Sequence, residues 1–242
     1  MQVIQNFTRM TKRKRGMETG ASNNMDVQLS KAMSRMLRHA PPKGSLDNQG
    51  WMELPVLLRH LKQGATEEQV RRIVNENDKK RFVLDDSAAV PRIRAAQGHS
   101  IQLSDPILEP VTDATSIPLA VHVTSQDGWS AIQTSGELRP MSRTHIHFAT
   151  QPNHMRANKW AQVYLKLKLQ EAMDSGYKFF LSSNQVLLCE GTLPVRFIES
   201  VDVQSLPQDW ARERRSRDNS QDRKDQNREE PRSSVCPPQT NG

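Results

Sequence analysis

The polar C-terminal stretch limits how many residues of this chain can belong to a folded domain. From residue 207 to residue 242 the sequence is dense in charges of both signs and nearly free of aliphatic side chains. Such a segment cannot bury enough apolar surface to offset the entropy lost on ordering it. We therefore expect disordered polar tails at 1–24 and 207–242, and a folded part confined to about residues 25–206.

The charge balance of the 242-residue chain is basic. Lys and Arg total 34 against 27 Asp and Glu, a formal net charge of +7. A basic surplus favours an anionic partner, most often a nucleic acid or a nucleotide. The basic run 12–15 fits a nuclear address or a nucleic-acid arm, and equally an ordinary solvated tail.

Several protein classes lose support from the sequence. The two cysteines, Cys189 and Cys236, are far apart, which argues against a disulfide framework or a zinc cluster. No apolar run is long enough for a membrane span, and we expect no signal peptide. P-loop, Rossmann and serine-hydrolase signatures are absent. We expect an intracellular protein of the nucleus or cytoplasm, with no membrane partner.

Residues 25–104 show the pattern of a small helical lobe with a β-ribbon. Apolar residues at helical spacing predict a first helix that ends near His39, before Pro41 and Pro42. A second helix is predicted over 54–61, and a third begins at a capping box that starts at Thr66. Short strands are predicted over 81–84, 92–95 and 100–103. Three helices followed by a ribbon predict a winged helix.

The remainder predicts a second lobe that is richer in strands. Residues 105–118 carry three prolines and read as a linker. In the lobe 119–206, a short helix is predicted over 129–136. Strands are predicted over 119–124, 144–149, 161–169, 178–183 and 185–191. The predicted fold class is α+β, with a winged-helix lobe followed by a mixed α/β lobe.

Two clusters of Arg and His side chains are candidate catalytic or ligand-binding groups. Arg38 and His39 share the last turn of the first helix, where the helix dipole alone would favour a cation. On a strand, Arg143, His145 and His147 would share one face. That face suits an anion, although a polar edge strand is also possible. A metal site completed by His122 is less favoured because no carboxylate or Cys lies at ligand spacing.

A third cluster surrounds the predicted ribbon. A wing that carries cations would suit an RNA backbone, which is read mainly through Lys and Arg contacts to phosphate. An ordinary charged hairpin would look the same. The candidate RNA contacts are Lys79, Lys80, Arg81, Arg92 and Arg94, with the polar turn residues Gln97 and His99.

The chain resembles the RNA (tRNA) 2′-phosphotransferases from about Leu29 to Gly191. The motifs that carry the resemblance are LSKAMSRMLRH, the Gly50-Trp51 pair, NDKKRF, IRAAQGHS, SRTHIHF and SSNQVLL, in that order. The resemblance implies a winged-helix RNA lobe and an ADP-ribosyltransferase-type lobe that holds NAD. It implies that the 2′-phosphate at a splice junction attacks the nicotinamide ribose carbon of NAD. Transfer of the phosphate then releases 2′-hydroxyl RNA, ADP-ribose 1″,2″-cyclic phosphate and nicotinamide, without a metal.

The resemblance also implies roles for individual residues. The catalytic group would be Arg38, His39, Arg81 and Arg143. NAD would be held by His122, Thr124, Ser125, His145, His147, Ser182, Asn184 and Val186. The chain departs from the family pattern at Val121, where a tyrosine is usual, and at Val123 and Gln185, where glycines are usual. We expect a monomer that acts on tRNA or another RNA with an internal 2′-phosphate. The alternatives are a non-catalytic RNA-binding module and an ADP-ribosyltransferase of RNA or phosphate ends.

Overall fold

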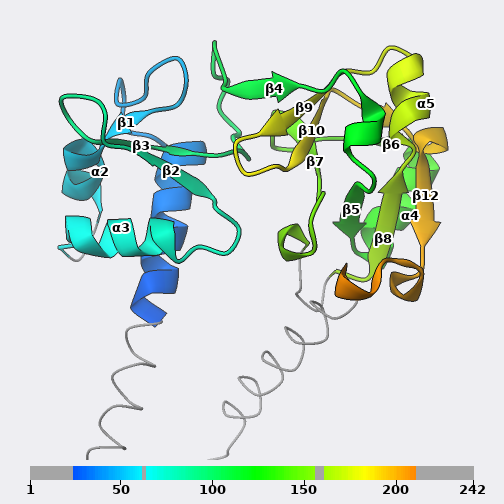
Figure 1. Cartoon of the computed structure of the whole chain (residues 1–242), viewed down its shortest axis with the longest axis horizontal. Coiled ribbons are helices and arrows are strands. Elements are labelled where there is room, and N and C mark those ends of the chain that lie inside the picture. The colour runs from blue at the N-terminus through cyan, green and yellow to red at the C-terminus, as the bar shows by residue number, and fades with distance from the viewer. Residues whose placement is uncertain (1–23, 62–63, 156–160, 211–242) are drawn as a thin grey trace, which may run out of the picture.

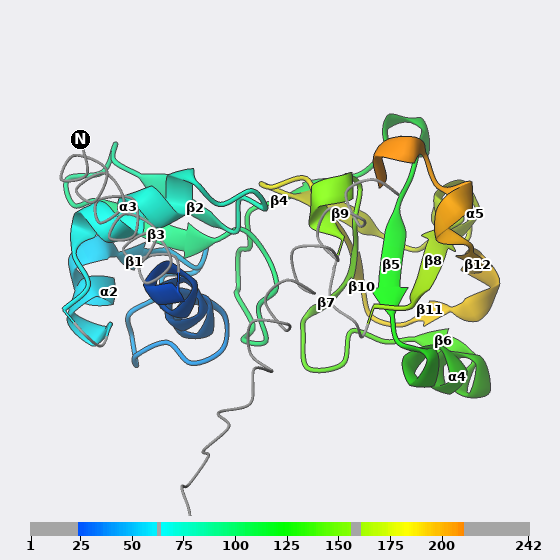
Figure 2. The same ribbon diagram turned by 90° about the horizontal axis from the view of Figure 1, so that it is seen from below.

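The computed structural model describes residues 24–61, 64–155 and 161–210. Its elements form two groups that lie side by side in both views (Figure 1, Figure 2). We name them the N-terminal lobe, which runs from residue 24 to β3, and the C-terminal lobe, which runs from β4 to residue 210. The segment 96–107 lies between them in the chain. The fold is mixed α/β, and most of both expected tails lies outside the described residues.

The N-terminal lobe packs helices against a three-stranded antiparallel sheet. A helix covers the described residues 24–38, followed by β1 (Met52–Glu53), α2 (Leu54–His60) and α3 (Glu67–Asn75). The lobe ends with β2 (Phe82–Asp85) and β3 (Arg92–Ala95), and the strand order is β1-β3-β2. The three predicted helices and the ribbon of the second and third strands are confirmed.

One predicted strand of this lobe is wrong. Residues 100–103 are irregular, and the third strand of the sheet is β1 instead. Both edges of β3 are occupied, by β1 and by β2, so residues 100–103 do not pair with it. The amide of Ser100 instead donates to the carbonyl of Arg38, at 3.0 Å.

Local sequence explains how the helices begin and which face they bury. The Thr66 hydroxyl accepts from the Gln69 amide, and the Gln69 side chain accepts from the Thr66 amide, so the predicted capping box is formed. On the helix 24–38, Met33 and Leu37 are fully buried. Their four-residue spacing places both on the face toward the sheet.

The C-terminal lobe is built on two antiparallel sheets and a two-stranded ribbon. The first sheet has the order β4-β9-β10-β7, the second β12-β8-β5, and the ribbon pairs β11 with β6. A bridge between Val121 and Ala149 joins the two sheets. The helices are α4 (Gln126–Ser135) and α5 (Leu169–Asp174). The strands are β4 (Leu108–Pro110), β5 (Val121–Thr124), β6 (Glu137–Leu138), β7 (His145–Phe148), β8 (Val163–Leu167), β9 (Phe179–Ser182), β10 (Leu187–Glu190), β11 (Leu193–Pro194) and β12 (Ile198–Val201).

The five strands and the helix predicted for this lobe are confirmed, but the lobe is larger than expected. The segment expected as a linker contains β4, which pairs with β9. The polar tail does not begin at residue 207, because Trp210 is 4% exposed and packs in a cluster with Leu206 and Val123. The indole of Trp210 supplies apolar surface that the charged residues near it in the sequence lack.

The buried apolar residues form separate clusters in the two lobes. Met33, Leu37 and Ile93 belong to one, whereas Phe148 and Leu187 belong to another. The two lobes therefore do not share one buried apolar cluster. Within the described ranges, no helix is both long and apolar enough to cross a membrane.

Candidate functional site

Arg38 is a buried cation at the end of the helix 24–38. Its side chain is 9% exposed, and its Nη2 donates weakly to the carbonyl of Arg81, at 3.4 Å. Burial, and then the nearby charges of Arg81 and Arg143, lower the pKa of Arg38 to about 10. Within the described part of the chain, Arg38 has no carboxylate partner and its Nε has no hydrogen-bond acceptor. A buried, charged group without a counter-ion is a natural anion site.

His39 follows Arg38 and is oriented by Ser100. Its Nδ1 lies 2.9 Å from the Ser100 hydroxyl, and the Arg38 carbonyl lies 3.5 Å from the same hydroxyl. The Arg38 carbonyl already accepts the Ser100 amide at 3.0 Å. We therefore assign the hydroxyl proton to the shorter contact, which leaves the proton of neutral His39 on Nε2. Burial, then Arg38 and Arg143, lower the pKa of His39, which favours this neutral form.

Arg81 is placed by the turn that leads into β2. Asn77 Oδ1 accepts from the Arg81 amide at 3.4 Å and from its Nη1 at 3.1 Å. Between them, Lys80 adopts a positive φ of 43°, and its amide closes the turn on the Asn77 carbonyl at 2.8 Å. Asn77 thus accepts hydrogen bonds from both the backbone amide and the guanidinium of Arg81.

Arg143 comes from the other lobe, in the turn before β7. Its neighbour Thr144 donates its amide to the carbonyl of His99, at 3.0 Å. Because Ser100 holds Arg38 and His39, the two-residue segment His99–Ser100 links the N-terminal cations to the turn of Arg143. The charge of Arg143 lowers the pKa of Arg38, His39 and His147, so the cations of the two lobes are within electrostatic reach of one another.

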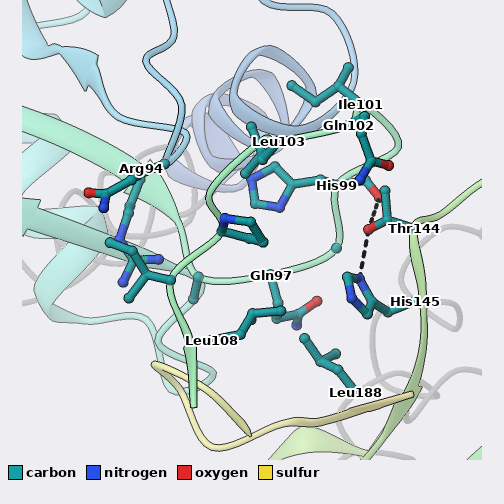
Figure 3. A pocket seen from close by; sticks show the side chains of 15 residues that line it. Arg94, Gln97, His99, Ile101, Gln102, Leu103, Leu108, Thr144, His145 and Leu188 are labelled. Carbon is teal, nitrogen blue, oxygen red and sulfur yellow. Dashed lines mark hydrogen bonds between the residues drawn. The ribbon is translucent and has the colours of Figure 1, made fainter. Parts of the chain in front are cut away.

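A small cavity with both apolar and polar lining residues lies between the lobes beside this segment. Its volume is about 30 Å³, enough for a water molecule. Figure 3 shows Gln97, His99, Thr144 and His145 around it, with a hydrogen bond between Thr144 and His145. Gln97 Oε1 and His99 Nε2 are buried here without a partner among the described residues. Burial, then Arg38 and Arg94, lower the pKa of His99 to about 4, so its ring is neutral at physiological pH.

The predicted face of β7 is confirmed. Ile146 and Phe148 are buried in the core, at 2% and 0% exposure, whereas His145 and His147 lie on the opposite face. His122 on β5 donates from Nδ1 to the His147 carbonyl, at 2.9 Å, and its ring lies edge to face with Phe148, at 5.9 Å between centroids. Burial, then Arg143 and His145, lower the pKa of His147 well below its usual value. Its buried Nε2 has no partner in the part of the chain that the structure describes.

The corner between β5 and α4 is closely packed. The Ser125 hydroxyl caps α4 by accepting from the Gly128 amide, at 3.0 Å. A Cβ on Gly128 would overlap the hydroxyl of Thr124, so glycine is required there. Val123 replaces a usual glycine, but its side chain packs with Tyr164 on the face opposite His122.

The β9–β10 turn carries the last predicted NAD contacts. The Ser182 hydroxyl donates to Asn184 Oδ1 at 2.8 Å and accepts from the Val186 amide at 3.0 Å. Asn184 Nδ2 donates to the carbonyl of Lys79 in the other lobe, at 2.8 Å. Gln185 stands in the left-handed region with φ 61°, which explains why glycine suits this position. These side chains shape the turn and join the lobes.

The cations around the β2–β3 ribbon make structural contacts. Lys79 Nζ donates to the Met155 carbonyl at 2.7 Å, and Lys80 Nζ to the Asn75 carbonyl at 3.0 Å. Arg92 pairs with Asp85 at 2.8 Å. Arg94 is 5% exposed and donates to Ser183 at 2.9 Å. Both arginines stack on Trp51, at 4.7 and 5.1 Å from its centroid. Their RNA-binding role stays a prediction.

Sequence reasoning missed the residues that hold the candidate catalytic side chains. These are Ser100, Asn77 and Thr144, all polar residues in turns. A signal existed for Ser100, which ends the polar turn after β3, but its partner His39 is 61 positions away in the chain. No group of three His, Cys, Asp or Glu side chains within the described ranges is arranged to hold a metal.

Several named proteins are similar in sequence to most of the folded part of this chain. A tRNA 2′-phosphotransferase of Saccharomyces cerevisiae is 36% identical over 194 residues, which are 74% of this chain and 84% of that protein. The tRNA 2′-phosphotransferase 1 of Bos taurus is 37% identical over 191 residues, 72% of this chain and 74% of that protein. A Schizosaccharomyces pombe relative is 36% identical over 173 residues, 68% of this chain but 47% of that protein.

The sequence profile of one family covers most of the chain and all four candidate catalytic residues. It matches residues 24–191, from the first described helix to the end of β10. The chain therefore belongs to the RNA 2′-phosphotransferase, Tpt1 / KptA family.

Proposed function

We propose that this protein removes the splice-junction 2′-phosphate from ligated tRNA by transferring it to NAD. The products would be RNA with a 2′-hydroxyl, ADP-ribose 1″,2″-cyclic phosphate and nicotinamide. The observation that carries the proposal is Arg38, a buried guanidinium that has two cationic neighbours and no carboxylate partner in the described structure. Family membership and the names of the relatives support the same activity.

A phosphate dianion fits the cluster in charge and in hydrogen bonding. Three guanidinium groups, from Arg38, Arg81 and Arg143, offer donors in planar forks that match phosphate oxygens. Neutral His39 would add one more donor from Nε2. Holding the phosphate in line with an acceptor carbon lowers the barrier by removing orientational entropy. The same arginines would stabilise the charge that builds on the phosphoryl oxygens during transfer.

The second substrate, NAD, would lie against the histidine face of the C-terminal lobe. His122, Thr124 and His147 line that face, and the unpartnered Nε2 of His147 fits a group that brings a hydrogen bond. NAD supplies the ribose carbon that receives the phosphate. His145 would steady the turn of Arg143 through Thr144. Ser125 at the start of α4, and the turn formed by Ser182, Asn184 and Val186, would complete the surroundings.

The proposal assigns a task to each lobe. The N-terminal lobe would act as a winged helix that presents the RNA, and the C-terminal lobe would be of the ADP-ribosyltransferase type. Three helices with a β1-β3-β2 sheet support the first assignment. The two joined antiparallel sheets around the histidine face support the second.

The test is a turnover assay on a short RNA with one internal 2′-phosphate, with and without NAD and without added metal. We expect loss of the 2′-phosphate, with release of nicotinamide, only when NAD is present. Arg38→Ala and Arg143→Ala should each lower kcat by at least about a hundredfold, because each removes charge stabilisation made in the transition state. The matched control is Arg139→Ala, which removes an exposed arginine near Arg143 that pairs with Glu137 at 3.2 Å.

Other outcomes would reject the proposal. RNA binding without phosphate loss or nicotinamide release would favour a non-catalytic RNA-binding module. Nicotinamide release with an RNA that gains mass would favour an ADP-ribosyltransferase. Full turnover by Arg38→Ala or Arg143→Ala would remove these residues from the catalytic group.

A further inference from the structure

A groove runs along the N-terminal lobe and ends at two of the candidate catalytic residues. It lies between the helix 24–38 and the end of α3, with a volume of about 580 Å³. His39 and Arg81 line it at one end, and Lys31 and Arg35 line it farther back along the helix. Sequence reasoning did not assign this groove or its two cations.

The cations of the helix recur every four residues and lead to the site. Lys31, Arg35 and His39 form one row, and Ser30, Ser34 and Arg38 form the row beside it. Four residues advance about 6 Å along a helix, a step similar to the spacing of neighbouring phosphates in an extended RNA strand. Met33 and Leu37 are buried on the side of the helix opposite Lys31 and Arg35. Lys31 and Arg35 therefore face outward, whereas Arg38 in the neighbouring row is buried.

The two outer cations are available to a ligand. Lys31 and Arg35 are exposed, and neither has an ion pair or hydrogen bond to a side chain in the described structure. Of the carboxylates that line the groove, Asp26 is already paired with Arg72, at 2.6 Å. Glu76 is the remaining acidic neighbour. The positive charges of the groove are therefore only partly compensated.

We infer that the nucleotides beside the 2′-phosphorylated nucleotide bind in this groove, with Lys31 and Arg35 on their backbone phosphates. The inference rests on the proposed function, because the 2′-phosphate itself would occupy the cluster of Arg38 and Arg143. Ribbon cations such as Arg92 and Arg94 are held by Asp85, Ser183 and Trp51. The helix, rather than the ribbon, thus offers uncommitted donors for phosphate.

The size and lining of the groove suit a short piece of single-stranded RNA. Its volume lies within the range of small-molecule sites, about 300–1,000 Å³, which corresponds to about one or two nucleotides. Ser30, Ser34 and Asn77 offer hydroxyl and amide groups for ribose hydroxyls or base edges. Single-stranded RNA is bound by such combinations of a basic track and polar edges.

The test compares RNAs that differ only in length on one side of the junction. Three substrates carry the same 2′-phosphate: a minimal dinucleotide, one extended by three nucleotides on the 5′ side, and one extended equally on the 3′ side. Wild-type enzyme should prefer one extended substrate by about tenfold in kcat/KM. Lys31→Glu/Arg35→Glu should abolish that preference. It should also reduce the slope of binding against salt by about 1.4, because two phosphate contacts are lost.

A matched control separates a local effect from a general change of charge. Lys43→Glu/Arg59→Glu reverses two exposed cations that do not line the groove and should keep the preference for length. Equal turnover of all three RNAs by wild type, or an unchanged preference in the groove variant, would overturn the inference. Absence of turnover by wild type on every RNA would instead reject the proposed function. In that case the affinity of each variant for the extended RNAs, measured by fluorescence anisotropy, still decides whether the groove binds RNA.

Discussion

The hydroxyl of Ser100 lies 2.9 Å from Nδ1 of His39, and this contact decides which nitrogen of the imidazole faces the candidate site. Without it, the proton of neutral His39 could rest on either nitrogen. The amide of the same serine holds the Arg38 carbonyl, at 3.0 Å. One residue between the lobes therefore contacts the ring of His39 and the backbone of Arg38.

We predict that Ser100→Ala lowers kcat about tenfold while the protein remains folded. The alanine keeps the backbone bond to Arg38 but frees the ring of His39, so fewer molecules present Nε2–H to the phosphate. Ser100→Thr should restore most of the activity, because threonine keeps the hydroxyl. Nitrogen-15 spectra of the histidine rings would check the tautomer directly. An unchanged Nε2–H tautomer of His39 in Ser100→Ala would contradict the assignment.

The buried histidines predict that stability falls in acid. Burial, then Lys79, lower the pKa of His154 from 6.5 to about 4. Between these values the unfolded chain binds a proton that the folded chain does not, so the free energy of unfolding rises with pH. The part due to His154 is fully present above pH 6.5 and is lost as pH falls from 6.5 toward 4.

His154→Gln should therefore flatten the pH dependence of unfolding over that window. Denaturant titrations at pH 7.5, 5.5 and 4.5 would measure it. The control is His60→Gln, which changes an exposed histidine at the end of α2. Curves for His154→Gln and wild type that stay parallel across the window would show that His154 is not the group responsible.

The backbone at Gln185 predicts a stabilising substitution. Its φ of 61° lies in the left-handed region, which costs a residue with a side chain about 1 kcal/mol relative to glycine. Gln185→Gly should raise the free energy of unfolding by about that amount. The rise in melting temperature should be a few degrees for a chain of this size. Gln185→Ala, which keeps a Cβ, should give no such gain and serves as the control.

The contact between Asn184 and Lys79 predicts how firmly the lobes are joined. Asn184 donates to the Lys79 carbonyl, two residues before Arg81. Asn184→Ala leaves that carbonyl without this donor and should cost about 1–2 kcal/mol. Asn184→Asp should cost more, because a carboxylate would face a carbonyl oxygen. Hydrogen exchange at residues 77–81 should accelerate in both variants, and more in Asn184→Asp. An equal effect of the two variants would indicate that only the loss of the amide donor matters and that the carboxylate adds no repulsion.

Periodicity and capping were enough to predict most elements of the fold. The capping box at Thr66, the helix that ends before Pro41 and the alternation over His145–Phe148 all depend on neighbours within a few positions. Such local patterns are visible in any single sequence. The family motifs likewise identified Arg38, His39, Arg81 and Arg143 as a candidate group.

Long-range packing decided the features that the sequence did not predict. Residues 100–103 do not pair with β3, both of whose edges are taken by β1 and β2. The segment 105–118 contributes β4 because β9 offers an edge to it, and Trp210 is buried in a cluster that contains Val123. Neither β9 nor Val123 is close in sequence to the segment that it contacts.

The sequence by itself determined the two-lobe order of elements, the residue types of the candidate catalytic group and the family. Only the tertiary structure decided how these residues are held. Arg94 donates to Ser183 and Lys79 to the Met155 carbonyl, while Ser100 orients His39. The physical reason is that a cation's role depends on which acceptors lie within about 3 Å of it. Those acceptors come from segments that only folding brings together.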